Sequence, residues 1–211
     1  MSEAREEVLA RIRAALGPGR AQPEVPREYR TAGSRSREEV LRLFAERVAD
    51  YRAAVDVTDD PAGAVERALA GVGARRVVVP HDLPPHLRPG GVETVVDEGL
   101  SPDDLDALDG VVTTCAAACA ETGSIALDGG PGQGRRALSL VPDLHVCVVR
   151  AEQVVETVPE LVARLEPSAR AGRPVVIVSG PSATSDIELQ RVEGVHGPRR
   201  LVVVLAARCG V

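Results

Sequence analysis

Several stretches of this chain are runs of apolar residues, mostly valine, isoleucine and leucine, without the alternating polar residues of a half-exposed strand. The clearest are residues 75–80 (RRVVVP), 144–150 (LHVCVVR) and 201–206 (LVVVLA). A strand that is apolar on both sides is buried on both sides, as in a mostly parallel sheet covered by helices. The pattern therefore predicts a three-layer α/β fold, in which a ligand binds beyond the carboxyl ends of the strands.

Shorter patterns predict the remaining elements. Further strands are expected at residues 54–58, 91–98, 110–115 and 174–179. Helical spacing and capping residues predict helices at residues 2–16, 37–53, 61–70, 101–109, 151–165 and 185–191. Residues 18–36 are rich in Pro, Gly, Arg and Ser, as is typical of a linker. The expected organisation is an N-terminal helix and linker over 1–36, followed by an α/β domain over 37–211.

Composition excludes several functional classes. The net charge is −6, so no overall positive field attracts nucleic acid. The three aromatic residues, Tyr29, Phe44 and Tyr51, lie in the first quarter of the chain, which leaves the main domain without a platform for stacking bases or a flavin. The chain contains no lysine, which excludes Schiff-base chemistry on lysine and a Walker-type phosphate loop.

The cysteines and the hydropathy suggest a cytoplasmic protein. No charged-then-apolar leader and no apolar run near 18 residues is present, so neither export nor a membrane span is expected. Cys115, Cys119, Cys147 and Cys209 do not have the spacing of a zinc site or an iron–sulfur cluster. Buried free thiols and no bound metal or cofactor are the expectation. As an alternative, Cys115 and Cys119 could form a redox pair or supply two metal ligands.

A glycine-rich stretch at residues 121–136, ETGSIALDGGPGQGRR, follows the strand at 110–115. Its glycines have the spacing GxGxG rather than the GxGxxG of a dinucleotide site, and Pro131 removes an amide that a phosphate would use. Three interpretations stay open: a dinucleotide loop, a mobile turn, and an anion site at which Arg135 and Arg136 bind a carboxylate.

Glu121 opens this stretch after a segment of small apolar residues. A carboxylate on apolar ground, flanked by Thr122, Gly123 and Ser124, could have a raised pKa and serve as a base or nucleophile. The alternative is a surface acid at the end of a loop. The residues alone leave both interpretations open.

A second candidate site follows the strand at 174–179. Backbone amides and hydroxyls at a helix start suit a bound anion, and the same groups can cap the helix. The residues concerned are Ser179, Gly180, Pro181, Ser182, Thr184 and Asp186. His196, next to Gly197 in a turn before the last strand, is either an acid, base or metal ligand, or a structural residue. His81 and His145 are weaker candidates, and His145 is expected in the core.

Two blocks of these residues together resemble the lactate utilization protein C family, whose members contain a LUD domain. The first block runs from Glu121-Thr122-Gly123-Ser124 through Gln133-Gly134-Arg135-Arg136 to Pro142-Asp143 and His145, and the second runs from Gly180-Pro181-Ser182 through Asp186 to His196-Gly197-Pro198. The resemblance implies a fold of the sugar-phosphate isomerase and CoA-transferase class. One departure is that Ala116 and Ala117 stand where family members have an acid and an aromatic residue.

The same resemblance implies a role in oxidising L-lactate to pyruvate beside iron–sulfur partner proteins. Because this chain lacks cluster-binding cysteine runs, it would be the cluster-free subunit, offering a pocket for an anion or small organic acid, or an assembly surface. Two alternatives stay open. One is a free-standing enzyme of the isomerase or CoA-transferase type that uses Glu121, and the other is a regulatory protein that senses a hydroxyacid. Whether the chain is a catalyst by itself is left open.

Overall fold

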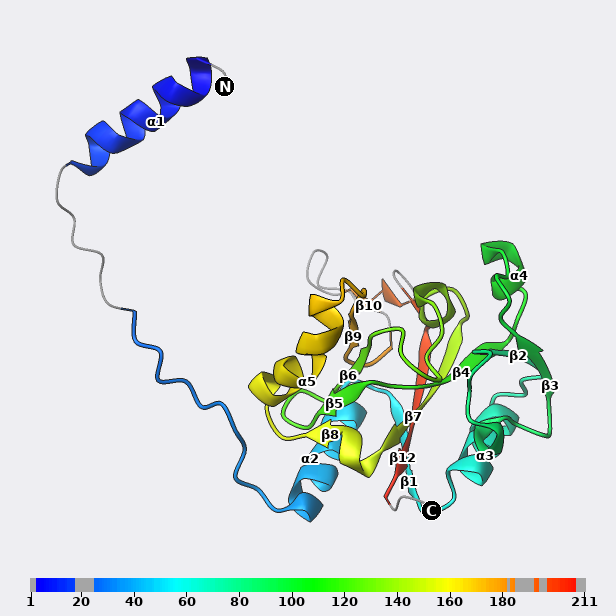
Figure 1. Cartoon of the computed structure of the whole chain (residues 1–211). Coiled ribbons are helices and arrows are strands. Elements are labelled where there is room, and N and C mark those ends of the chain that lie inside the picture. The colour runs from blue at the N-terminus through cyan, green and yellow to red at the C-terminus, as the bar shows by residue number, and fades with distance from the viewer. Residues whose placement is uncertain (1–2, 18–24, 182, 185–191, 194–196, 208–211) are drawn as a thin grey trace. The chain divides into compact units, whose positions relative to one another are not determined.

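The computed structural model describes residues 3–17, 25–181, 183–184, 192–193 and 197–207 (Figure 1). The chain forms two compact units, residues 1–30 and residues 31–211. The first contains α1 (Glu3–Leu16), a helix without a buried residue, which confirms the helix expected there. The second contains all the other elements. In the described part of the chain, no helix is long and apolar enough to cross a bilayer.

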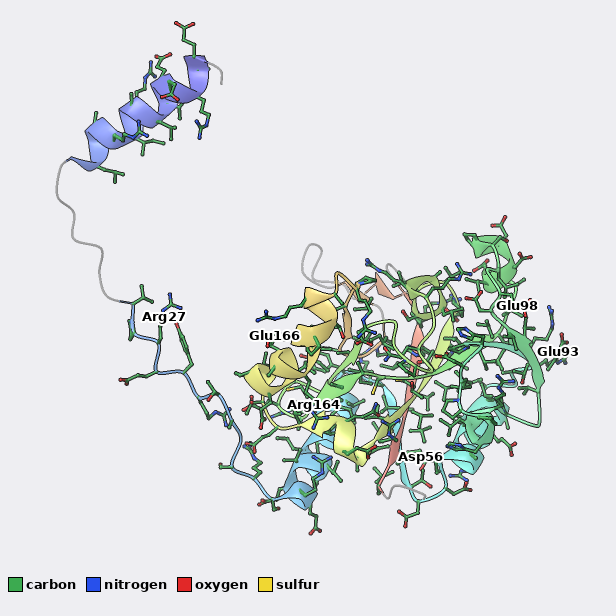
Figure 2. All side chains as sticks on the ribbon, viewed as in Figure 1. Arg27, Asp56, Glu93, Glu98, Arg164 and Glu166 are labelled. Atoms are coloured by element: carbon green, nitrogen blue, oxygen red, sulfur yellow. The ribbon has the colours of Figure 1, made fainter. Side chains whose placement is uncertain are left out.

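The second unit is built on a sheet of six parallel strands in the order β1-β12-β7-β4-β2-β3. The strands are β1 (Ala54–Thr58), β2 (Arg76–Val79), β3 (Glu93–Val96), β4 (Gly110–Thr114), β7 (Leu144–Arg150) and β12 (Arg200–Ala206). Asp56 and Glu93, labelled in Figure 2, mark the two edge strands, β1 and β3. The predicted three-layer α/β fold with a mostly parallel sheet is confirmed.

Helices cover both faces of this sheet. On one face, α3 (Pro61–Gly71) packs Val65 and Leu69 against Val146 of β7, with η1 (Pro85–Leu87) beside it. On the other face, α2 (Arg37–Asp50) buries Phe44 and Val48 against β7 and β12. The β2–β4 part of that second face is covered by α4 (Pro102–Asp106) and the 3₁₀ helix η2 (Arg136–Ser139).

A smaller sheet, in the order β8-β5-β6-β9, packs on the same face as α2. Its strands are β8 (Val154–Val155), β5 (Ala117–Cys119), β6 (Ser124–Leu127) and β9 (Val176–Val178). Leu161 and Leu165 of α5 (Val158–Arg170) cover its outer side. The strand expected at 174–179 therefore lies in this sheet, antiparallel to β6. A separate two-stranded ladder joins β10 (Ala183–Thr184) to β11 (Val192–Glu193).

The single helix predicted over 151–165 is wrong. Residues 151–153 form the 3₁₀ helix η3 (Ala151–Gln153), and β8 then pairs with β5. Helix α5 begins only at Val158, after a capping box in which Glu160 accepts a hydrogen bond from the Thr157 amide at 2.8 Å. Pro159 thus lies in the first turn, where its missing N–H has no helical partner to lose. The helix predicted at 185–191 lies outside the described residues.

The turn between β5 and β6 packs directly on α2. Gly123 in this turn has φ +59°, and a Cβ there would lie 2.7 Å from the carbonyl carbon of Arg47 and 2.8 Å from the Val48 nitrogen. Next to this contact, the hydroxyl of Ser124 in the first block lies 2.6 Å from that of Ser179, the residue before the second block. The α2 helix therefore packs against the turn of the first block, close to the start of the second.

We expect Gly123→Ala to lower the free energy of unfolding by about 2 kcal/mol, because the side chain adds backbone strain and a collision with α2. Urea denaturation followed by circular dichroism measures the loss. Gly73→Ala is the matched control, since Gly73 has φ +70° with no atom within 4 Å of its added Cβ. It should lose only the backbone part, about 1 kcal/mol. Equal losses of unfolding free energy in the two variants would show that α2 shifts to accommodate the added Cβ without a further loss of stability.

Candidate functional site

A pocket of about 490 Å³ lies at the carboxyl ends of β2 and β3, and we call it the carboxyl-edge pocket. Pro80, His81 and Asp82 follow β2, and Asp97 follows β3. The glycine-rich turn forms another wall through Gly129, Gly130 and residues 133–136. This is the edge at which an open parallel sheet usually binds its ligand.

Buried side chains fix the shape of the glycine-rich turn. Asp128 accepts hydrogen bonds from the Gly130 amide and from Nε2 of Gln133, each at 3.0 Å. Gln133 in return accepts one from the Asp128 amide at 2.7 Å. Both residues are almost fully buried, at 7% and 4% exposure. Asp128 and Gln133, which belong to the first family block, therefore fix the conformation of the turn through buried hydrogen bonds.

The turn is also tied to the elements around it. Asp128 accepts a hydrogen bond from the Ser168 hydroxyl on α5 and forms an ion pair with Arg173 at 3.1 Å. Thr114, at the end of β4, donates its hydroxyl to the Pro131 carbonyl and its amide to the Gly132 carbonyl, both at 2.8 Å. Burial opposes ionisation of Asp128, but the hydrogen bonds outweigh it and lower the pKa of its carboxyl. We infer an ionised, structural Asp128.

The structure weakens the dinucleotide interpretation of this turn further. A dinucleotide loop leads into a helix whose N-terminal amides bind the pyrophosphate. Here the turn leads into η2, a single 3₁₀ turn at Arg136–Ser139. Its glycines have packing roles, because a Cβ on Gly132 would lie 2.7 Å from Oγ1 of Thr114 and one on Gly134 would lie 2.4 Å from Leu138.

The two arginines after the turn differ in whether their guanidinium groups already have an ion-pair partner. Arg135 donates Nε to Oδ2 of Asp97 at 2.7 Å and Nη2 to Oδ1 at 3.0 Å. This bidentate pair lowers the pKa of the Asp97 carboxyl, mainly through the hydrogen bond from Arg135. Arg136 is exposed, lines the same pocket, and its guanidinium has no partner among the described residues. Arg136 is therefore the arginine that is available to an anion.

A second pocket, of about 230 Å³, runs beside β9, and we call it the β9 pocket. Its wall includes four predicted site residues, Ser179 and, from the second block, Gly180, Pro181 and Gly197. Gly180 has φ +92°, and a Cβ there would lie 2.6 Å from Cβ of Tyr51 at the end of α2. The second block thus lines a pocket rather than only capping a helix.

His145 forms part of the same wall, although it is only 2% exposed. Its Nε2 lies 2.7 Å from the Thr113 hydroxyl on the neighbouring strand β4. Two buried thiols lie next to this pair. Hydrogen bonds from Cys115, His145 and Thr113 lower the pKa of the Cys147 thiol, whereas the contact with Cys147 and burial raise the pKa of Cys115. His145 is a core residue, as predicted, and a pocket residue as well.

The predicted residue Glu121 lines neither of these pockets. It lies in the turn between β5 and β6, where its amide donates to the Glu156 carbonyl at 3.1 Å. The neighbouring Thr122 has a buried Oγ1 without a hydrogen-bond partner in the described part of the chain. Ser182, Asp186 and His196 lie outside the described residues, and only the backbone of Thr184 is described, in β10.

Most residues of the carboxyl-edge pocket were not predicted as site residues, among them Asp97 and Ser139. Asp97 lies at the end of β3, so the rule that ligands bind at carboxyl ends would have found it. Ser139 gave no such signal, because it reaches the pocket through η2. The described cysteines Cys115, Cys119 and Cys147 are buried and free, as expected. Over the described residues, no group of three or more His, Cys, Asp or Glu side chains could hold a metal.

Comparison with known proteins gives consistent results. A sequence model of the LUD domain matches residues 98–206. A "Lactate utilization protein C" from Deinococcus radiodurans is 48% identical, over 97% of this chain and 96% of the relative. The "Uncharacterized protein YkgG" of Escherichia coli is 37% identical over 42% of this chain and 40% of its own length. The crystal structure of a DUF162 family protein from Deinococcus radiodurans, 44% identical, covers 82% of this chain and 99% of that one, with a TM-score of 0.72.

Proposed function

Because this chain belongs to the lactate utilization protein C family of LUD-domain proteins, we propose that it takes part in the utilization of L-lactate. Its role would be that of the cluster-free subunit in a system that oxidises lactate to pyruvate. The observation that supports this most strongly is the 48% identity to a lactate utilization protein C over nearly the whole of both chains.

The redox groups of such a system belong to its partners in this proposal. Conversion of lactate to pyruvate removes two electrons and two protons, so an electron acceptor is required. The cysteines of this chain have no cluster-binding spacing. We therefore assign the clusters to iron–sulfur partner proteins and the recognition of the acid, or of the partners, to this chain.

The carboxyl-edge pocket is the proposed site for the acid. Arginine binds carboxylates with two parallel hydrogen bonds, which suits the available guanidinium of Arg136. Arg135 has a different part in this proposal: its ion pair with Asp97 fixes the wall from which Arg136 projects. The proposal does not use Glu121, because Glu121 is not among the residues that line this pocket.

A test in the native organism examines whether the chain takes part in lactate utilization. The tagged chain should co-purify with iron–sulfur proteins, and deletion of its gene should stop growth on L-lactate while growth on pyruvate continues. The proposal fails if the deletion strain grows normally on lactate and no iron–sulfur protein is recovered. Growth on pyruvate is the internal control for a general growth defect of the deletion strain.

We expect Arg136→Ala to weaken the affinity for L-lactate by about 10- to 100-fold, because it removes a charge-assisted hydrogen bond. Isothermal titration calorimetry with sodium lactate measures the change. Arg170→Ala is the matched control, since Arg170 is exposed on α5, lines neither pocket and forms a local ion pair with Glu166 at 2.6 Å. An affinity that is the same in the wild type and both variants would remove Arg136 from the proposed site.

A further inference from the structure

The two pockets are neighbours that share part of their lining, and we call the two together the groove. Ser139 and Val176 line both the carboxyl-edge pocket and the β9 pocket. Ser139 closes η2 and donates its hydroxyl to the Arg136 carbonyl at 3.1 Å, and Val176 begins β9. The described lining of the groove therefore includes residues at the end of β3, on η2 and along β9.

The chemistry of the groove changes along its length. The carboxyl-edge pocket contains the charged side chains of Asp82, Asp97, Arg135 and Arg136. The described wall of the β9 pocket has no Asp, Glu or Arg, and its apolar members are Leu140, Val176, Ile177, Val178, Pro181, Pro198 and Leu201. Its polar side chains are those of Ser139, His145 and Ser179, and each of them already forms a hydrogen bond within the protein. The charged side chains of the described lining thus lie at one end of the groove, and the other end is lined by apolar and internally bonded side chains.

The groove is also larger than a three-carbon acid requires. The carboxyl-edge pocket alone has a volume of about 490 Å³, and the β9 pocket adds about 230 Å³. Pockets of roughly 300–1,000 Å³ usually enclose drug-sized ligands, whereas lactate has few heavy atoms. A bound lactate would leave most of the groove to water.

We propose that the groove binds 2-hydroxy acids with an aliphatic tail longer than that of lactate. The carboxylate lies at Arg136, and the tail runs past Ser139 into the β9 pocket. Three residues of a 3₁₀ helix rise roughly 6 Å, so a tail of a few methylenes spans the distance from Arg136 to Ser139. This inference rests on the proposed function for the carboxylate end only. The tail site is a separate claim.

Affinity as a function of tail length tests the proposal. We expect the dissociation constants of the full chain for lactate, 2-hydroxybutyrate and 2-hydroxyhexanoate, measured by calorimetry, to fall about fourfold for each added methylene, because each buried methylene contributes to binding as it does to folding. The Ile177→Asp variant should lose this dependence on tail length. Ile177 lines the β9 pocket and is 57% exposed, so the substitution spares the core.

The control is Val162→Asp on α5, because Val162 is similarly exposed, at 59%, and lines neither pocket. It should keep the full dependence on tail length. If lactate binds through Arg136 but longer acids bind no more tightly, the tail site is refuted and the anion site stands. Gains that Ile177→Asp does not reduce also refute the tail site. If none of the acids binds, both the proposed anion site and the proposed tail site are refuted.

Discussion

Replacing Asp128 by alanine should lower the free energy of unfolding by about 3–4 kcal/mol. The substitution leaves the buried Gly130 amide, Nε2 of Gln133 and the Ser168 hydroxyl without their acceptor, and Arg173 without its counter-ion. Each unsatisfied buried group costs about 1–3 kcal/mol, and part of this is recovered by relaxation and water. Urea denaturation at pH 7 measures the loss.

Asp143→Ala is the control for a lost carboxylate at the surface. Asp143 pairs with Arg199, and both side chains are well exposed, so we expect a change below about 1 kcal/mol. If Asp128→Ala lowers the free energy of unfolding no more than this control does, then the hydrogen bonds and ion pair of Asp128 do not stabilise the glycine-rich turn. Affinity for lactate should fall along with stability in Asp128→Ala, because the turn forms a wall of the pocket.

The pH dependence of the same variant provides a second readout. The pKa of Asp128 is lowered in the folded protein, so its contribution to stability is present above about pH 3.9, the value for an unfolded Asp, and is lost as the pH falls through the folded-state value. The difference in stability between wild type and Asp128→Ala should therefore shrink on acidification from pH 7 toward pH 3.

The second large effect is expected from Phe44→Ala, with a loss of about 3–5 kcal/mol in the free energy of unfolding. Phe44 is fully buried, and it packs in the cluster that joins α2 to both sheets. Removal of its ring leaves a cavity where α2 meets Ile125 of β6 and Val203 of β12. Thermal and urea unfolding of the full chain measure the effect.

Tyr29→Ala is the matched aromatic control, because Tyr29 is 67% exposed, and we expect it to change stability by less than about 0.5 kcal/mol. A loss below about 1 kcal/mol in Phe44→Ala would contradict the role of α2 as a core helix. That role matters for the site, since α2 contacts Gly123 of the first family block and Gly180 of the second.

The main sheet was predictable because its signal is local. The runs at β2, β7 and β12 are apolar on both sides, and only burial between two layers of helices satisfies that pattern. The smaller sheet was not predictable in the same way. β8 has two residues and β5 has three, which is too short for a periodic pattern, and the Val-Val of β8 also fits a helix.

The candidate site was predictable in its parts and not in its grouping. Arg136 and the residues Ser179, Gly180, Pro181 and Gly197 were foreseen, and each lines a pocket. Glu121 was predicted as a site residue as well, but it lies in the β5–β6 turn and lines neither pocket. Its position depends on a pairing between β5 and β8, which lie more than 30 residues apart, and no local pattern specifies such a pairing.

The strand order has a consequence for how the chain can fold as it is synthesised. β12 inserts between β1 and β7, although β1 is the first strand of the body and β12 the last. Until residues 200–206 leave the ribosome, β1 has no neighbour and β7 has an open edge. Open strand edges invite pairing with other chains, and contacts between distant segments form slowly. The nascent body is therefore most exposed to misassembly just before its final strand arrives.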